Sequence, residues 1–123
     1  PKPTLLENLT LDENITYFTN YLGVDEKMVN SKLNKFKLTD YRKDSIKNFS
    51  SGMIKRSELA ICDIKNPDVL CIDEPLNYLD KEGIEILEDL LNIRSSDNKC
   101  SILSSQESLN ILTNIETVNL NEV

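Results

Sequence analysis

The sequence contains no histidine and no tryptophan, and it has only three glycines among its 123 residues. Without histidine, general acid or base catalysis by an imidazole is excluded. Zinc sites are excluded too, because the three cysteines, Cys62, Cys71 and Cys100, are scattered along the chain. Their odd number and unpaired spacing provide no disulfide framework, which favours a reducing compartment.

Long hydrophobic runs and excess positive charge are also missing. No apolar run approaches the roughly 20 residues that span a bilayer, so we expect membrane contact only through a partner. Lysine and arginine number 14 against 21 acidic residues, a net charge of -7. Because this charge repels phosphate backbones and anionic lipid, we expect protein or small-ligand partners and no nucleic acid.

The first half of the chain has the pattern of helices. Thr10 and Glu13 have the spacing of a capping box, and Gly23 is placed to end the following helix in a left-handed conformation. We expect three helices, at 11–22, at 25–36 and from near Ser51 to just before Pro67, with a polar, irregular stretch at 37–48.

The second half alternates strand and helix. Val69 to Ile72 is a continuous apolar run of the kind shown by a parallel strand that is covered on both faces. Asp80 is placed to cap the helix after it. Two further strands, at 101–104 and 117–120, and a short helix at 108–112 complete the pattern. The fold class is therefore α/β, with a helical part at 1–66 and a β-α-β-α-β part of a parallel sheet at 67–123.

An acidic pair follows the first apolar strand. Asp73 and Glu74 lie where the carboxyl end of a parallel strand reaches the ligand-binding edge of an open sheet. Asp73 suits Mg²⁺, which prefers one carboxylate together with water and phosphate oxygens. Glu74 is then free to orient or deprotonate a water in phosphoryl transfer. The alternative is that the pair simply ends the strand and enters a turn at Pro75.

Ser50, Ser51 and Gly52 open the third helix. The free N–H groups and the dipole at such an end attract phosphate, and glycine lets the backbone approach closely. The alternative is an ordinary serine N-cap. The order of this cap, a helix, an apolar strand, the acidic pair and a capping aspartate favours a nucleotide-related site over a chance arrangement.

The same residues resemble the ABC ATPase family. Phe49 to Met53, with Arg56 after them, are similar to its signature motif. Val69 to Pro75 resemble its Walker B strand with the catalytic glutamate, and Leu79 with Asp80 resembles its D-loop. The chain thus resembles the C-terminal part of an ABC transporter ATP-binding domain in a P-loop NTPase fold, with the region after the Q-loop at its start.

This resemblance implies a role for each motif residue. Ser50, Ser51, Gly52 and Met53 would contact the γ-phosphate of ATP bound to an opposite subunit, and Asp80 would lie at the dimer seam. Asp73 would reach Mg²⁺ mainly through water, and Glu74 would be the general base. The implied partners are a second ATP-binding subunit in a head-to-tail dimer and a transmembrane permease. The implied location is the cytoplasmic face of the membrane.

The sequence departs from the family in two places. It contains no Gly-x-x-x-x-Gly-Lys-Ser/Thr loop, and Gly23, Gly52 and Gly83 are too dispersed to form one. We therefore expect a fragment that is inactive alone. Gln106 holds the position of the family's usual histidine and cannot carry a proton near neutral pH. The alternative is a shift of one residue, in which Gln106 only starts a helix.

Three functions remain open. The first is a subunit that couples ATP hydrolysis to membrane transport. The second is a degenerate module that binds nucleotide or a partner without turnover, favoured by Gln106 and the missing loop. The third is a soluble ATPase of the same superfamily, disfavoured by the acidic charge. An uncovered edge and face of the sheet also predict self-association.

Overall fold

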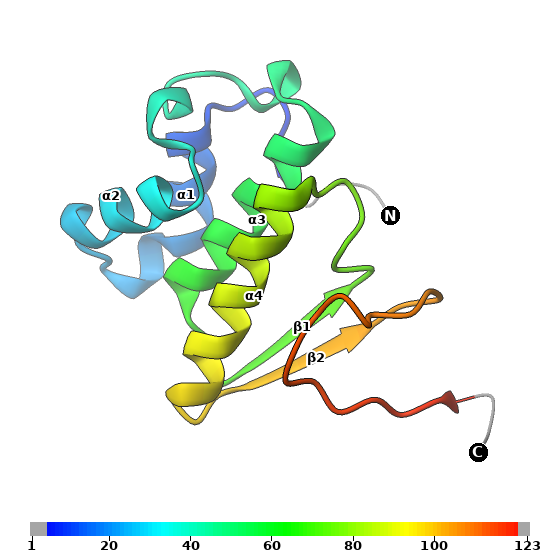
Figure 1. Ribbon diagram of the computed structural model, residues 1–123. Coiled ribbons are helices and arrows are strands. Elements are labelled where there is room, and N and C mark those ends of the chain that lie inside the picture. The colour runs from blue at the N-terminus through cyan, green and yellow to red at the C-terminus, as the bar shows by residue number, and fades with distance from the viewer. Residues whose placement is uncertain (1–4, 121–123) are drawn as a thin grey trace.

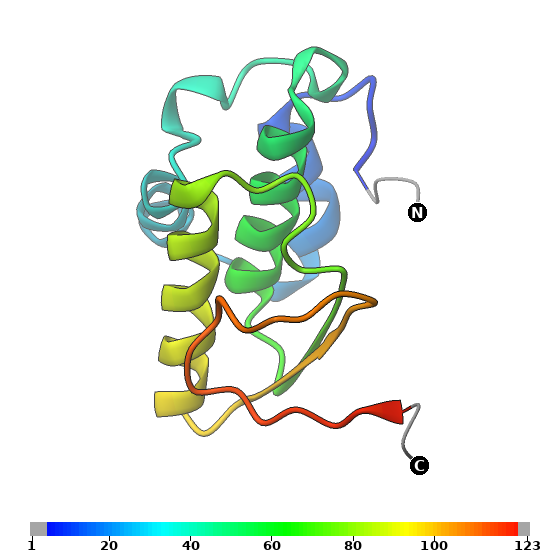
Figure 2. The same ribbon diagram turned by 45° about the vertical axis from the view of Figure 1, so that its right-hand side comes forward.

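The computed structural model describes residues 5–120. Helices α1 (Leu11–Thr19), α2 (Glu26–Lys35) and α3 (Ser51–Lys65) precede strand β1 (Val69–Asp73), helix α4 (Lys81–Ser96) and strand β2 (Cys100–Ser104). Figures 1 and 2 show α3 beside α4, with α1 and α2 on the far side of α3 from the strands. The α/β class predicted from the sequence is confirmed.

Local capping explains where the first helices begin and end. At the start of α1, Thr10 Oγ1 accepts the N–H of Glu13 and the Glu13 carboxylate accepts the N–H of Thr10, which completes the predicted capping box. A 3₁₀ turn at Asn20–Leu22 extends α1 to Gly23, whose φ of 60° is left-handed as predicted. Asp25 caps α2 through the N–H of Lys27.

The stretch between α2 and α3 is irregular, as predicted, apart from 3₁₀ turns at Thr39–Tyr41 and Ile46–Asn48. Arg42 in this stretch pairs with Asp12 on α1 and Glu26 on α2, each at 2.7 Å. Arg42 therefore connects the two helices to the loop. The hydrogen bond with Glu26, and to a smaller extent that with Asp12, raises the pKa of Arg42.

An ion pair joins α2 to α3 inside the helical part. Asp63 on α3 is buried, and its carboxylate lies 3.0 Å from Lys32 Nζ and 3.6 Å from Lys35 Nζ. Since buried carboxylates are costly without partners, the two lysines fix the approach of α2 to α3.

The two strands form a parallel sheet in which Val69 pairs with Cys100 and Asp73 with Ser104. The two strands are connected through α4, since neighbouring parallel strands need a crossover of this kind. Leu70 and Ile72 are buried, whereas Val69 and Ile102 are each 54% exposed. The apolar run is typical of a strand covered on both faces, but α3 and α4 cover only one face here, and the uncovered apolar face expected for this chain is present.

One hydrophobic cluster runs through both parts of the chain. It includes Leu11 and Phe36 from the helical part and Leu87 and Leu90 from α4, all fully buried. Asn66 ends α3 in a left-handed conformation, with φ of 45°, before the architecture changes. The division into residues 1–66 and 67–123 stays a prediction.

The chain after β2 differs from the prediction. No helix forms at 108–112; the N–H of Leu112 closes a single turn on the carbonyl of Leu109, and the N–H of Thr113 donates to Glu88 on α4 at 2.9 Å. No strand forms at 117–120, where the chain pairs with neither β1 nor β2, the two strands of the sheet among residues 5–120. The predicted β-α-β-α-β series is therefore β-α-β in the structure.

Candidate functional site

The candidate site lies at the carboxyl edge of the two-stranded sheet. Because β1 and β2 are parallel, the loops that follow them leave the sheet at the same edge, with Asp73 opposite Ser104 in the register. Figure 1 shows the chain turning from this end of β1 towards the top of α4, past the first turn of α3. The edge thus gathers three segments that are distant in sequence.

Asp73 is the last residue of β1 and is exposed. Its Oδ1 accepts a hydrogen bond from Ser104 Oγ at 2.7 Å, across the strand pair. The short contact orients the carboxylate without burying it. Asp73 is therefore accessible to a ligand outside the sheet edge.

Glu74 follows in a left-handed conformation, with φ of 48°. Its N–H donates to the carbonyl of Ser104 at 2.8 Å, which extends the ladder one step past the strand. Its carboxylate accepts Ser105 Oγ at 3.1 Å on Oε2 and the backbone N–H of Gln106 at 3.0 Å on Oε1. The loop after β2 therefore holds the Glu74 carboxylate from one side.

The Gln106 contact is made by the backbone. No helix starts at Gln106 in the structure, where residues 105–113 form bends, turns and irregular backbone. The Gln106 residue is exposed, and the structure brings its peptide rather than its amide group to Glu74.

At the start of α3, Ser50 is an ordinary N-cap, with its Oγ accepting the N–H of Met53 at 3.2 Å. Ser51 is exposed. A Cβ on Gly52 would lie 3.0 Å from the carbonyl oxygen of Tyr78, so the helix start closely approaches the turn after β1. A side chain at this position would require the Tyr78 peptide to shift, so the approach favours glycine.

Asp80 caps α4 as predicted, because its Oδ1 accepts the N–H of Gly83 at 2.8 Å. Ser50 and Asp80 each make these bonds at their own helix start. Within residues 5–120, neither is hydrogen-bonded to Asp73 or Glu74. In this structure both side chains act as helix caps.

The sequence analysis missed Lys55, Ser104 and Ser105. Lys55 Nζ donates to the carbonyl of Glu74 at 3.4 Å, and the two serines hold the two carboxylates. The serines could have been found from their place directly after a predicted strand. Lys55 has a weaker signal, its position three residues after Gly52 on the same helix face.

The carboxylate of Asp73 could contribute to a magnesium site, but the described residues do not form a complete one. Residues 5–120 contain no cluster of three or more Asp, Glu, Cys or His side chains that could hold a metal ion. Asp73 offers one exposed carboxylate, and Mg²⁺ is commonly held by one or two carboxylates with water and phosphate oxygens. The remaining ligands would have to come from nucleotide and solvent.

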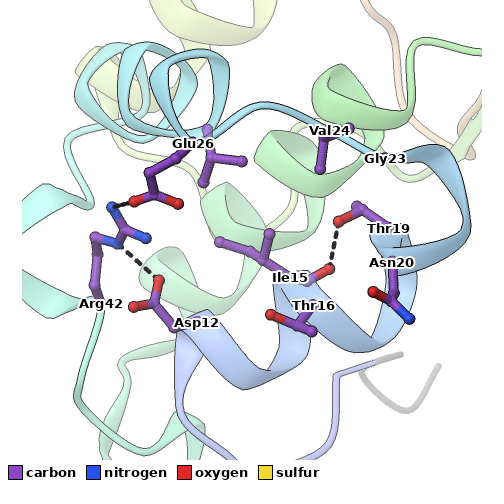
Figure 3. A pocket seen from close by; sticks show the side chains of 10 residues that line it. Asp12, Ile15, Thr16, Thr19, Asn20, Gly23, Val24, Glu26 and Arg42 are labelled. Carbon is purple, nitrogen blue, oxygen red and sulfur yellow. Dashed lines mark hydrogen bonds and ion pairs between the residues drawn. The ribbon is translucent and has the colours of Figure 1, made fainter.

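A second concavity lies far from this edge, between α1 and α2 (Figure 3). Its volume is about 320 Å³, and Thr16, Thr19 and Val24 are among its lining residues. Arg42 at one side of it is already paired with Asp12 and Glu26. The charged side chains that line this concavity therefore pair with one another.

The parallel strand pair, its crossover helix and the carboxylates at its carboxyl edge form an α/β arrangement, and comparison with solved structures identifies it as part of a P-loop NTPase fold. A solved structure described as "Structure of ATP binding subunit of ABC transporter" superposes with a TM-score of 0.76 and 26% identity. The match covers 85% of this chain and 46% of that one.

The family model described as "ABC transporter" matches residues 2–77. The chain belongs to the ABC transporter family, and more narrowly to its ATP-binding proteins. Proteins of this family use ATP and Mg²⁺, dimerise and work with transmembrane permease components.

Three curated relatives show the range of similarity. The lantibiotic transport ATP-binding protein SrtF of Streptococcus pyogenes is 36% identical over 94% of this chain and 48% of its own length. The uncharacterized ABC transporter ATP-binding protein YcbN of Bacillus subtilis is 33% identical over 87% and 35%. The cytochrome c biogenesis ATP-binding export protein CcmA of Shewanella frigidimarina is 29% identical over 85% and 49%. The chain spans half or less of the length of these relatives.

Proposed function

We propose that this chain supplies the water-activating edge and the signature loop of an ATP-binding subunit that couples ATP hydrolysis to membrane transport. The observation that supports this most directly is the Glu74 carboxylate, which is held by Ser105 and by the Gln106 peptide next to the exposed Asp73. A general base needs this kind of fixed orientation.

Glu74 acts on water in this proposal. Each carboxylate oxygen has two lone pairs, so Oε1 and Oε2 can accept a water proton while keeping their bonds to the loop. Glu74 thereby orients the attacking water and takes its proton. Asp73 would hold Mg²⁺ mainly through water, and the ion would supply positive charge to the phosphate oxygens.

The start of α3 acts across a dimer. Ser50, Ser51, Gly52 and Met53 present backbone N–H groups and the positive end of the helix dipole, which suit the γ-phosphate of ATP held by an opposite subunit. Asp80 lies at the seam of this head-to-tail dimer. The chain itself contains no Gly-x-x-x-x-Gly-Lys-Ser/Thr loop, so the grip on the nucleotide comes from another segment.

The second partner is a transmembrane permease, which the ATP-binding subunit contacts at the cytoplasmic face of the membrane. No helix among residues 5–120 has both the length and the apolar character needed to cross a bilayer. The names of SrtF and CcmA associate those relatives with lantibiotic transport and cytochrome c biogenesis export. They support a transport role here without indicating a substrate.

A second candidate is a module that binds nucleotide or a partner without turnover. The observation in its favour is Gln106, whose side chain cannot shuttle a proton where the family usually has histidine. A third and less favoured candidate is a soluble ATPase of the same superfamily, such as one that works on ribosomes or chromosomes. Such proteins contact nucleic acid, which the net charge of -7 does not suit.

The decisive experiment is Glu74→Gln in the full polypeptide that the gene encodes. The change keeps the size of the side chain and removes its basicity, so ATP should be retained after gel filtration while hydrolysis falls by roughly 100-fold or more. Unchanged turnover would reject Glu74 as the base. Undetectable turnover in the unsubstituted protein, together with retained ATP, would favour the non-hydrolysing module.

The 123-residue chain alone offers a second test. Titration of the chain with Mg-ATP by calorimetry should show no binding, because the proposed contacts lack a phosphate cradle. Binding in the micromolar range that Asp73→Ala abolishes would contradict this and would locate a complete site within the chain. Reading the coding sequence upstream of Pro1 complements it, since a phosphate-binding loop there supports the coupling role.

A further inference from the structure

The turn between β1 and α4 contains two residues in an unfavourable backbone conformation. Glu74 has φ of 48° and Tyr78 has φ of 65°, and neither is glycine. Such conformations cost energy in residues with a Cβ, so they persist only where the surroundings hold them. In this turn the surroundings are α3 and β2, which both contact it.

Both left-handed residues turn their carbonyl groups to the first turns of α3. The Glu74 carbonyl accepts Lys55 Nζ at 3.4 Å and also the N–H of Asn77 at 3.2 Å. The Tyr78 carbonyl lies against Gly52, 3.0 Å from the position that a Cβ would occupy there. Gly52 and Lys55 are three residues apart and share one face of α3. A single helix face therefore receives both strained peptides.

The backbone of Glu74 is held on both sides. Its N–H donates to Ser104 on the neighbouring strand, and its carbonyl accepts from Lys55 on α3. With both peptides fixed, the side chain is directed at Ser105 and the Gln106 N–H. Loss of the Lys55 contact would leave this carbonyl bonded to the N–H of Asn77 within its own turn but no longer anchored to α3.

We propose that Lys55 is a positioning residue for Glu74. Its ammonium group binds the Glu74 carbonyl and so stabilises the left-handed conformation that directs the carboxylate to the loop after β2. The consequence for catalysis rests on the proposed function, and the effect on Glu74 geometry does not. Because the start of α3 is proposed to contact nucleotide in the opposite subunit, Lys55 links that contact to the orientation of the base in its own subunit.

The first test measures amide hydrogen exchange of Gln106 by NMR in the 123-residue chain. Lys55→Met removes the ammonium and keeps the aliphatic stem. We expect exchange of the Gln106 N–H to become roughly fivefold faster, as its bond to Glu74 weakens. The matched control is Lys65→Met at the other end of α3, where the lysine is exposed, and it should leave Gln106 unchanged.

Rescue separates positioning from simple loss of stability. Lys55→Arg keeps a positive donor for the carbonyl and should restore slow exchange at Gln106. Exchange at Gln106 that stays slow in a folded Lys55→Met chain would overturn the proposal. So would a uniform acceleration across α3 and β1, because it would indicate only a less stable fold.

The second test uses the full polypeptide. Lys55→Met should lower kcat roughly tenfold while leaving KM for ATP within about twofold, since it misdirects the base without touching the nucleotide. An equal rise in KM would contradict a positioning role. Faster Gln106 exchange combined with no effect of Glu74→Gln on turnover would keep the positioning role and reject the proposed function.

Discussion

The backbone N–H of Gln106 donates to Oε1 of Glu74 at 3.0 Å, so the peptide of residue 106, and not its side chain, holds the candidate base. The exposed Gln106 amide group therefore remains available for a separate role. The effect of a residue at this position on Glu74 geometry and its effect on proton transfer can consequently be measured independently.

This separation predicts different results for two substitutions of Gln106 in the full polypeptide. Gln106→Ala should leave the hydrogen-exchange rate of the backbone N–H at position 106 unchanged, because the peptide is retained. Gln106→His should raise ATP turnover by about tenfold or more, since an imidazole can accept and donate a proton near neutral pH. A faster amide exchange in Gln106→Ala, or no gain from histidine, would contradict these roles.

The sequence predicted the elements whose signals are local. The Thr10 and Glu13 capping box, Gly23 and the Asp80 cap each depend on residues within one turn, and all formed as expected. The segment after β2 could not be predicted in the same way. It contacts α4 through Glu88, 25 residues earlier in sequence, which accepts the Thr113 N–H.

The site shows the same division between local and distant signals. The positions of Asp73 and Glu74 at a strand end followed from the apolar run before them. The partners Ser104, Ser105 and Lys55 are separated from them by 31, 31 and 19 residues, so only the folded arrangement of β2 and α3 identifies them. The uncovered face of β1, by contrast, was expected, and the exposure of Val69 and Ile102 agrees with it.

The ion pairs of Asp63 make it a sensitive point in the helical part. Asp63→Asn keeps the side-chain volume but removes the charge that Lys32 and Lys35 approach at 3.0 and 3.6 Å. We expect the free energy of unfolding to fall by about 1–3 kcal/mol, because the partners are largely enclosed. Urea denaturation followed by circular dichroism measures this change.

The control for Asp63 is Asp89→Asn on the exposed side of α4. Its effect should stay within about 0.5 kcal/mol, as is usual for surface substitutions. Equal effects of the two substitutions would mean that the pairs of Asp63 with Lys32 and Lys35 do not stabilise the packing of α2 on α3.

Docking of the C-terminal segment on α4 should depend on pH. Hydrogen bonds from the Thr113 hydroxyl, and then from its N–H, lower the pKa of Glu88. Because the folded pKa is lowered, the contact is fully present above the ordinary glutamate pKa and is lost as pH falls through the lowered value. The Thr113 amide resonance should therefore shift in acid with a midpoint below the ordinary value.

Thr113→Val tests the cause of this shift. It removes the hydroxyl donor and keeps the N–H, so the midpoint should move towards the ordinary glutamate pKa without reaching it. Glu85→Gln, at an exposed neighbouring position on α4, should leave the midpoint unchanged. A midpoint that is the same with threonine and valine would show that the hydroxyl does not stabilise the Glu88 carboxylate.

The three cysteines can report which face of the sheet is open. Cys71 and Cys100 are exposed, whereas Cys62 on α3 is partly buried and burial raises the pKa of its thiol. Since the thiolate is the reactive form, alkylation of the dilute chain at pH 8 should modify Cys71 and Cys100 about tenfold faster than Cys62. Mass spectrometry of peptides from a time course measures the three rates.

The same measurement at increasing protein concentration tests self-association through the uncovered face. Cys71 and Cys100 share that face with Val69 and Ile102, so a second copy packed there would slow alkylation of both cysteines and leave Cys62 unaffected. Rates that stay constant, together with a monomeric mass by light scattering, would reject self-association through this surface. Slower alkylation in the full polypeptide but not in concentrated chain would instead mean that another segment of the same protein covers the sheet.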